Sequence, residues 1–83
     1  MPDINFSIKV IDSSGRPISN VKVAVFDNAN IGGSYDSDYT DDDGWVTLSI
    51  PCFGYSFPGK VFIDGDEVGS QTFSDGDSAS YYL

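Results

Sequence analysis

The sequence predicts an all-β fold, a small seven-stranded antiparallel β-sandwich, from three observations. Apolar and polar residues alternate in several short segments, as they do in strands that bury one face. Asp-Gly steps at residues 43–44, 64–65 and 75–76 separate some of these segments, and such steps favour tight hairpin turns because glycine accepts a positive φ. No segment has a helical period. Short strands with closely spaced turns are typical of a sandwich or barrel.

The first three strands are expected at residues 4–11, 21–25 and 34–40. In the first, isoleucine, phenylalanine and valine side chains share one face, and polar side chains share the other. Residues 12–17 form a polar turn with glycine and proline. The second strand places three valines on one face, with Lys22 and Ala24 facing outward. The third alternates tyrosine and serine with aspartate.

The fourth strand, residues 45–50, has the clearest alternation, with Val46, Leu48 and Ile50 on one face and Trp45 on the other. Residues 51–59 contain two prolines and are expected to form a loop, because proline cannot donate to a sheet. The last three strands are expected at residues 60–64, 68–73 and 78–83. The predicted core consists of the apolar residues on the inward faces: Phe6, Ile8, Val10, Val23, Val25, Val46, Leu48, Ile50, Val61 and Ile63.

Two motifs carry a family resemblance. Residues 10–23 contain a strand, then Gly-Arg-Pro-Ile, then alternating valines, and residues 40–44 read Thr-Asp-Asp-Asp-Gly before another alternating strand. This pattern resembles the carboxypeptidase regulatory-like, transthyretin-like domains. The resemblance covers about the first fifty residues and implies a seven-stranded, prealbumin-like or Ig-like sandwich. These motifs concern turns and core, so the resemblance implies an architecture and no activity.

The composition limits the classes of function. The 83 residues, numbered 1–83, are expected to form one domain. The net charge of −9 argues against nucleic acid and against an anionic membrane surface as partners. The absence of histidine removes the commonest general base, so we expect no enzyme activity.

The localisation expected from the sequence is the cell surface, the extracellular space or a virion surface. The chain contains no apolar run of membrane-spanning length, so membrane insertion is not expected. Its N-terminus also lacks the basic region and apolar run of a signal peptide. Three explanations are compatible with this: an intracellular protein, export by another route, or a module of a longer chain.

An acidic cluster is the first candidate site. Five carboxylates fall within eight residues: Asp36, Asp38, Asp41, Asp42 and Asp43. Like charges at 4 Å repel by about 1 kcal/mol per pair in water, so a hard cation would be stabilised among them. Ca²⁺ binds several carboxylate oxygens on a flexible loop and is the one cofactor the sequence suggests. The spacing differs from that of an EF-hand loop, and the alternative is a solvated turn in which aspartates act as turn formers.

An aromatic segment is the second candidate site. Phe53, Tyr55 and Phe57 alternate between two prolines and, if extended, would form one aromatic edge that Trp45 could join. Such an edge could bind a protein or a carbohydrate. The alternative is that these side chains fold back and cover the open end of the sandwich.

These observations favour a non-catalytic binding or structural module, for example an interaction domain of an adhesin, of a phage or viral particle, or of a multi-domain secreted protein. One alternative is a Ca²⁺-assisted carbohydrate-binding module. Another is a structural subunit that forms homo-oligomers through its edge strands.

Overall fold

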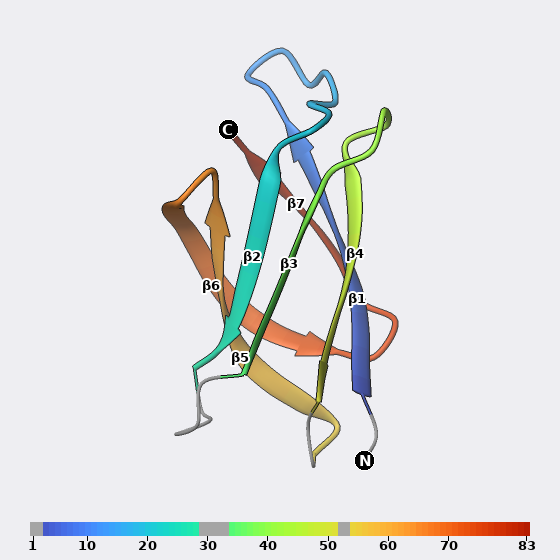
Figure 1. Cartoon of the computed structure of the whole chain (residues 1–83), viewed down its shortest axis with the longest axis vertical. Coiled ribbons are helices and arrows are strands. Elements are labelled where there is room, and N and C mark those ends of the chain that lie inside the picture. Colours follow the sequence, from blue (N-terminus) through green and yellow to red (C-terminus); the bar gives the residue numbers. More distant parts are fainter. Residues whose placement is uncertain (1–2, 29–33, 52–53) are drawn as a thin grey trace.

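The computed structural model describes residues 3–28, 34–51 and 54–83, and these residues form strands and turns without a helix (Figure 1). The strands are β1 (Asp3–Ile11), β2 (Lys22–Asp27), β3 (Tyr35–Tyr39), β4 (Trp45–Pro51), β5 (Ser56–Ile63), β6 (Asp66–Ser74) and β7 (Ser78–Tyr82).

The strands form two sheets. One has three strands in the order β4-β1-β7, and the other has four in the order β3-β2-β5-β6. The predicted all-β class is therefore confirmed. The pairing is antiparallel except between β1 and β7, which run parallel. The expectation of a purely antiparallel fold is wrong for this pair, because the turn after β6 carries the chain to the other sheet beside the second half of β1.

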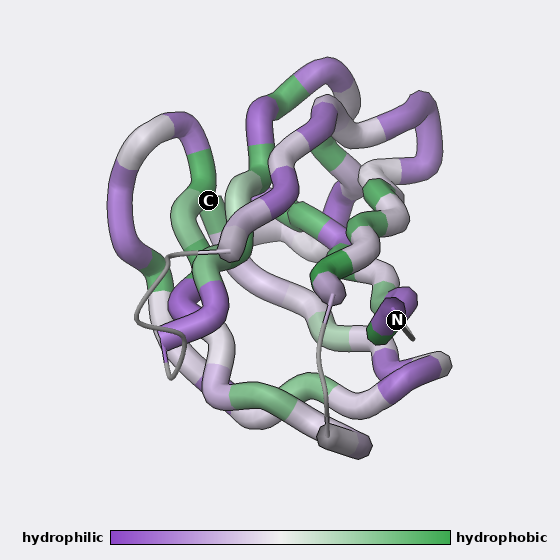
Figure 2. The backbone as a smooth tube through the Cα atoms, turned by 60° about the horizontal axis from the view of Figure 1, so that its bottom comes forward, coloured by the Kyte–Doolittle hydropathy of each residue, from purple (hydrophilic) through white to green (hydrophobic). Residues whose placement is uncertain are grey.

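The core lies between the two sheets. All ten residues predicted to be buried belong to it, which confirms the inward faces read from the alternation. Figure 2 shows hydrophobic residues recurring along the chain between hydrophilic ones. Three further core residues were not in the prediction: Ile4, Phe57 and Phe73.

Phe57 and Phe73 complete an aromatic cluster within the core. The ring centroid of Phe73 lies 4.4 Å from that of Phe6, and the centroid of Phe57 lies 5.6 Å from each. Gly59 makes room for these rings, because a Cβ atom there would lie 2.7 Å from the ring of Phe73. The close approach explains the glycine within a strand.

The predicted loop at residues 51–59 is wrong in its second half, because β5 begins at Ser56 and includes Phe57, Pro58 and Gly59. The last Cα partners of β2 and β5 are Asp27 and Gly59, so Pro58 lies just beyond that ladder. On the side facing β2, the carbonyl oxygen of Pro58 accepts a 2.8 Å hydrogen bond from the backbone N–H of Asn28, and no N–H group of Pro58 is needed. Pro58 is therefore tolerated in a strand that has neighbours on both sides.

The two motifs behind the family resemblance contact each other at one end of the molecule. The buried hydroxyl of Thr40 donates to the carbonyl oxygen of Ile18 at 2.7 Å and accepts from the N–H of Val21 at 3.1 Å. Gly44 lies against Pro17, since a Cβ atom at Gly44 would lie 2.9 Å from the Cβ atom of Pro17. The Thr-Asp-x-x-Gly turn thus holds the Gly-x-Pro-apolar turn in place.

Candidate functional site

Among the described residues, the outer face of the four-stranded sheet carries the largest group of exposed aromatic side chains. In β2, Val23 and Val25 point into the core, so Lys22, Ala24 and Phe26 point outward. The register adds the side chains that share this face on the neighbouring strands: Tyr35, Ser37 and Tyr39 from β3; Lys60 and Phe62 from β5; Glu67, Ser70 and Thr72 from β6.

Three of these side chains form an aromatic patch, defined here as Phe26, Tyr35 and Phe62. The rings of Phe26 and Tyr35 stack with centroids 5.1 Å apart, and Phe62 meets Phe26 edge-on at 5.2 Å. Phe26 remains 38% exposed and Tyr35 61% exposed. A surface ring that contacts one aromatic ring on each side differs from the single exposed apolar side chains that any soluble protein has.

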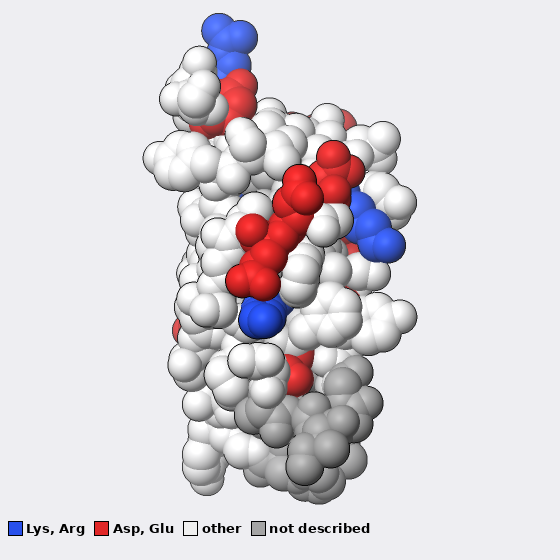
Figure 3. Space-filling view, turned by 90° about the vertical axis from the view of Figure 1, so that its left-hand side faces the viewer, with Lys and Arg blue, Asp and Glu red and all other residues white. Residues whose placement is uncertain are grey.

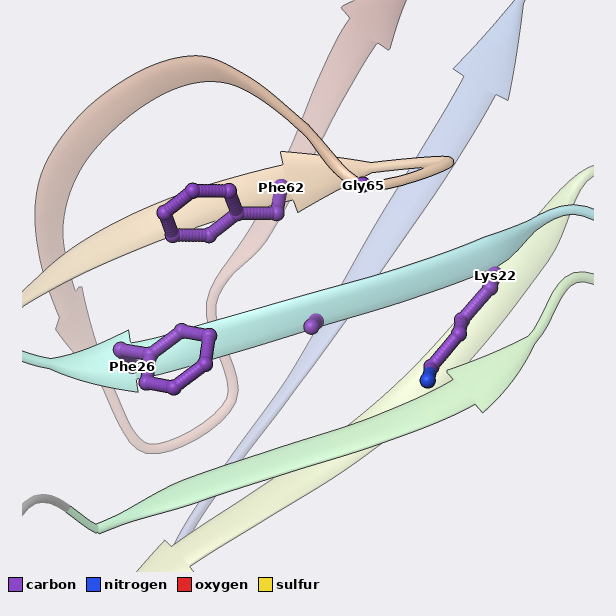
Figure 4. Close-up of a pocket in the computed structure, with 5 residues that line it drawn as sticks. Lys22, Phe26, Phe62 and Gly65 are labelled. Carbon is purple, nitrogen blue, oxygen red and sulfur yellow. The ribbon is translucent and has the colours of Figure 1, made fainter.

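A hollow of about 270 Å³ lies beside the patch (Figure 4). It is lined by Lys22, Ala24, Phe26, Phe62 and Gly65. The hollow exists because the small residues Ala24 and Gly65 lie among large ones. In Figure 4, Lys22 and Phe26 extend from the same strand, and Phe62 lies on the strand beside them. The hollow is smaller than the roughly 300–1,000 Å³ of pockets that enclose drug-sized ligands.

The outer face of the four-stranded sheet carries charges of both signs. Two lysines, Lys22 and Lys60, and one acid, Glu67, point outward from its strands. The Nζ atom of Lys60 lies 3.6 Å from Oε1 of Glu67. Asp64 and Asp66 flank Gly65 beside the hollow, and Figure 3, which faces the β6 side of the molecule, shows acids in a continuous band with a basic side chain at each end.

Sequence reasoning missed this site, although a signal was present. A second strand that ends at Val25 leaves Phe26 unassigned, but one more step of the alternation places it outward. The alternation of residues 60–64 likewise places Phe62 opposite to Val61 and Ile63. Tyr35 enters the patch only through the pairing of β2 with β3, which the sequence does not show.

Of the four aromatic residues predicted to bind a partner, the three that the structure describes do not form one surface. Phe57 is 2% exposed and belongs to the core, while Tyr55 is 97% exposed. Trp45 begins β4, whereas Tyr55 follows the last residue of β4. The first and last residues of this strand lie toward opposite ends of the molecule (Figure 1). The Nζ atom of Lys9 lies 5.7 Å from the centre of the Trp45 ring. Phe53 lies outside the described residues.

Asp36, in the predicted acidic cluster, connects the two sheets. Its Oδ2 atom accepts a 3.0 Å hydrogen bond from the backbone N–H of Ser49, and its Oδ1 atom accepts one of 2.9 Å from that of Ser37. Asp36 lies on β3 and Ser49 on β4, which are edge strands of different sheets. The carboxylate therefore covers an edge N–H group that would otherwise be available to another strand.

Asp41 forms the turn before β4. Its Oδ1 atom accepts hydrogen bonds from the backbone N–H groups of Asp43, at 2.9 Å, and Trp45, at 3.0 Å. Asp12 makes the same two bonds, to the N–H groups of Ser14 and Arg16. The two polar turns at this end of the molecule thus share one geometry, in which an aspartate replaces missing backbone partners.

The remaining members of the cluster are exposed. Asp38 accepts a 2.8 Å bond from the N–H of Tyr39, and Asp42 and Asp43 lie at the tip of the turn. Within the described ranges, no three carboxylate or other ligating side chains are grouped so as to hold a metal ion. A Ca²⁺ site and its alternative, a solvated turn, both stay predictions for this cluster.

Tyr81, on β7, packs against β6. Its hydroxyl donates a 2.7 Å hydrogen bond to Oε1 of Gln71, and its ring packs over Gly69, where a Cβ atom would lie 3.1 Å from it. Burial raises the pKa of Tyr81 above the usual 10.0, because the phenolate would be poorly solvated there.

Comparisons with protein-family models, with curated proteins and with solved structures find no match to this chain. The part of the chain that the structure describes contains no helix long and apolar enough to cross a membrane. The fold and the site therefore define an all-β domain of two sheets with an aromatic outer face.

Proposed function

We propose that this chain is a non-catalytic module that binds another protein through the outer face of its four-stranded sheet. The observation that carries the proposal is the aromatic patch beside its hollow. Interface hot spots are enriched in aromatic side chains, and they commonly centre on a side chain of one partner that fills a pocket of the other.

The hollow favours a protein side chain over a small ligand. Its lining is mainly the rings of Phe26 and Phe62 with Ala24, and Lys22 supplies the one charged group. A hollow of about 270 Å³ that is open to solvent can accept one large side chain but would leave most of a drug-sized ligand exposed. Lys22 is also the one titratable residue in the lining of the hollow, which offers little for catalysis.

The proposal includes the finer fold. We assign the two sheets to a seven-stranded, transthyretin-like sandwich, as the resemblance implies. The contact of Thr40 with Ile18, and that of Gly44 with Pro17, support this assignment, because they give the residues of both motifs a joint structural role. An interaction domain of a larger surface assembly is the setting that the resemblance and the binding face favour together.

The proposal is tested by selecting a random-peptide phage library on the immobilised domain. We expect binders with a large apolar residue whose binding is lost on Phe26→Ser. Tyr82→Ser is the matched control, because Tyr82 is an exposed ring on the other sheet. Failure to enrich any peptide, or binders that Phe26→Ser leaves unaffected, would overturn the proposal, provided that the variant keeps the wild-type melting temperature within a few degrees.

The same preparation tests the alternatives. Sedimentation equilibrium would reveal a self-assembling subunit, whereas the charge of −9 on each copy predicts a monomer. A glycan array that responds to Trp45→Ala or Tyr55→Ala, and not to Phe26→Ser, would favour the carbohydrate-binding module instead.

A further inference from the structure

Backbone N–H groups on the free edge of a sheet attract a further strand unless something covers them, and on β3 aspartates cover them. The N–H of Thr40 is directed toward the β2 side, so those of Tyr39 and Ser37 are directed away from β2. Oδ1 of Asp38 accepts the N–H of Tyr39 at 2.8 Å. Oδ1 of Asp36 accepts that of Ser37 at 2.9 Å.

The edges of β4 and β6 are protected in related ways. On β4, the N–H of Ser49 bonds to Asp36. On β6, the N–H of Ser74 bonds to Oδ2 of Asp77 at 2.8 Å, and the register with β5 shifts along the strand. Such a shift bends a strand, which discourages pairing between edges.

The free edge of β7 differs from these three edges. β7 lies beside β1 at one edge of the three-stranded sheet (Figure 1), and its five residues include no charged residue and no proline. The carbonyl oxygen of Asp77 and the N–H of Leu83 bond to β1. The alternation of the ladder therefore directs the backbone groups of Ser78, Ser80 and Tyr82 away from β1. Within the described part of the chain we find no hydrogen-bond partner for the N–H groups of these three residues.

We infer that this edge binds an extended, uncharged segment of another polypeptide, which joins the three-stranded sheet as a further strand beside β7. The free N–H and C=O groups recur at every second residue, and an extended backbone offers acceptors and donors with the same repeat. Side chains on the inward face of the added strand would lie beside Ala79 and Tyr81, which pack against the core, so apolar residues are favoured there.

The inference is independent of the proposed function, because β7 belongs to the other sheet. A second copy of this chain offers the same backbone groups. It is disfavoured as the occupant, since each copy carries a net charge of −9 and the two would repel.

The test uses a fluorescent synthetic peptide in which valine and threonine alternate between terminal lysines, and fluorescence anisotropy measures its affinity for the whole chain. Two further forms are methylated on the backbone nitrogen, one at every threonine and the other at every valine. A strand beside β7 directs only alternate N–H groups toward it. We therefore expect one methylated form to bind about tenfold or more weakly and the other to bind like the unmodified peptide. Equal affinities of the two methylated forms would overturn the inference.

Ser80→Pro tests the same contact from the protein side. It removes an N–H from the free edge and leaves the ladder with β1, so peptide binding should weaken about tenfold. Thr72→Pro is the matched control, because it makes the same change on the free edge of β6. Weakening by Thr72→Pro and not by Ser80→Pro would place the peptide on β6 and refute the inference. If Ser80→Pro lowers the melting temperature, the two methylated peptides decide with the wild-type chain.

Phe26→Ser separates this inference from the proposed function, and we expect it to leave the affinity for the peptide unchanged. If Phe26→Ser abolishes binding and both methylated forms bind alike, the peptide occupies the aromatic patch, so the proposed function stands and this inference is wrong. If the peptide does not bind, this inference is wrong, and the phage selection still tests the proposed function. Dimers in sedimentation equilibrium that Ser80→Pro dissociates would assign the edge to a second copy and also overturn the inference.

Discussion

Gly44→Ala tests how the two turn motifs lock together. Two costs add at this position. Gly44 has a φ of +79°, which costs a residue with a Cβ atom about 1–2 kcal/mol. The new Cβ atom would also lie 2.7 Å from the carbonyl oxygen of Val10 and 2.9 Å from the Cβ atom of Pro17, and such overpacking typically costs about 1–3 kcal/mol. We therefore expect a loss of about 2–5 kcal/mol from the free energy of unfolding.

Gly65→Ala is the matched control. Gly65 has a φ of +86°, but a Cβ atom there would meet no atom within 4 Å. It carries the conformational cost alone, about 1–2 kcal/mol. Urea unfolding of both variants beside the wild type measures the difference, which is the steric term. Equal losses in the two variants would refute the packing of Gly44 against Pro17 and Val10.

Three further predictions concern the core, the β6–β7 side and the acidic cluster. Leu48→Ala removes a buried side chain and should lower the free energy of unfolding, measured in urea, by about 2–5 kcal/mol. An unchanged free energy of unfolding would contradict the inward orientation of Leu48 on β4. Burial raises the pKa of Tyr81 in the folded protein. As the pH rises above about 10, the Tyr81 hydroxyl therefore loses its proton in the unfolded chain before it does so in the folded chain, and the free energy of unfolding should fall. Tyr81→Phe should reduce that fall and Tyr82→Phe should not; the same alkaline loss in both variants would contradict the burial of Tyr81. The turn hydrogen bonds of Asp41 predict no calorimetric heat with millimolar Ca²⁺, whereas a heat that vanishes in Asp41→Asn/Asp43→Asn would establish a calcium site.

The core was predictable because strand pleating imposes a period of two on burial. That period is local, so ten core residues could be named without any knowledge of the pairing. The start of β5 was not predictable in the same way. Pro58 and Gly59 are local signals for a loop, and they are accommodated by the ladder between β2 and β5, which ends at Gly59, and by the ring of Phe73. The end of this ladder and the position of the Phe73 ring both depend on the tertiary structure, which local sequence signals do not show.

The candidate site was harder to predict than the core. An outward aromatic residue in a strand looks the same in sequence whether it stands alone or in a patch. Phe26, Tyr35 and Phe62 come from three strands, and only their pairing brings the rings together. The aromatic segment 53–57 appeared more promising because its residues are neighbours in sequence, yet the fold buries Phe57 and leaves Tyr55 exposed.

Chemical-shift mapping by NMR can locate the contact surface, which we propose to be the outer face of the four-stranded sheet. A peptide selected on the wild-type domain is titrated into the isotope-labelled chain. We expect the largest shift changes at Lys22, Ala24, Phe26, Tyr35 and Phe62. Largest changes at Trp45 or Tyr55, or in the turn at residues 41–44, would contradict it.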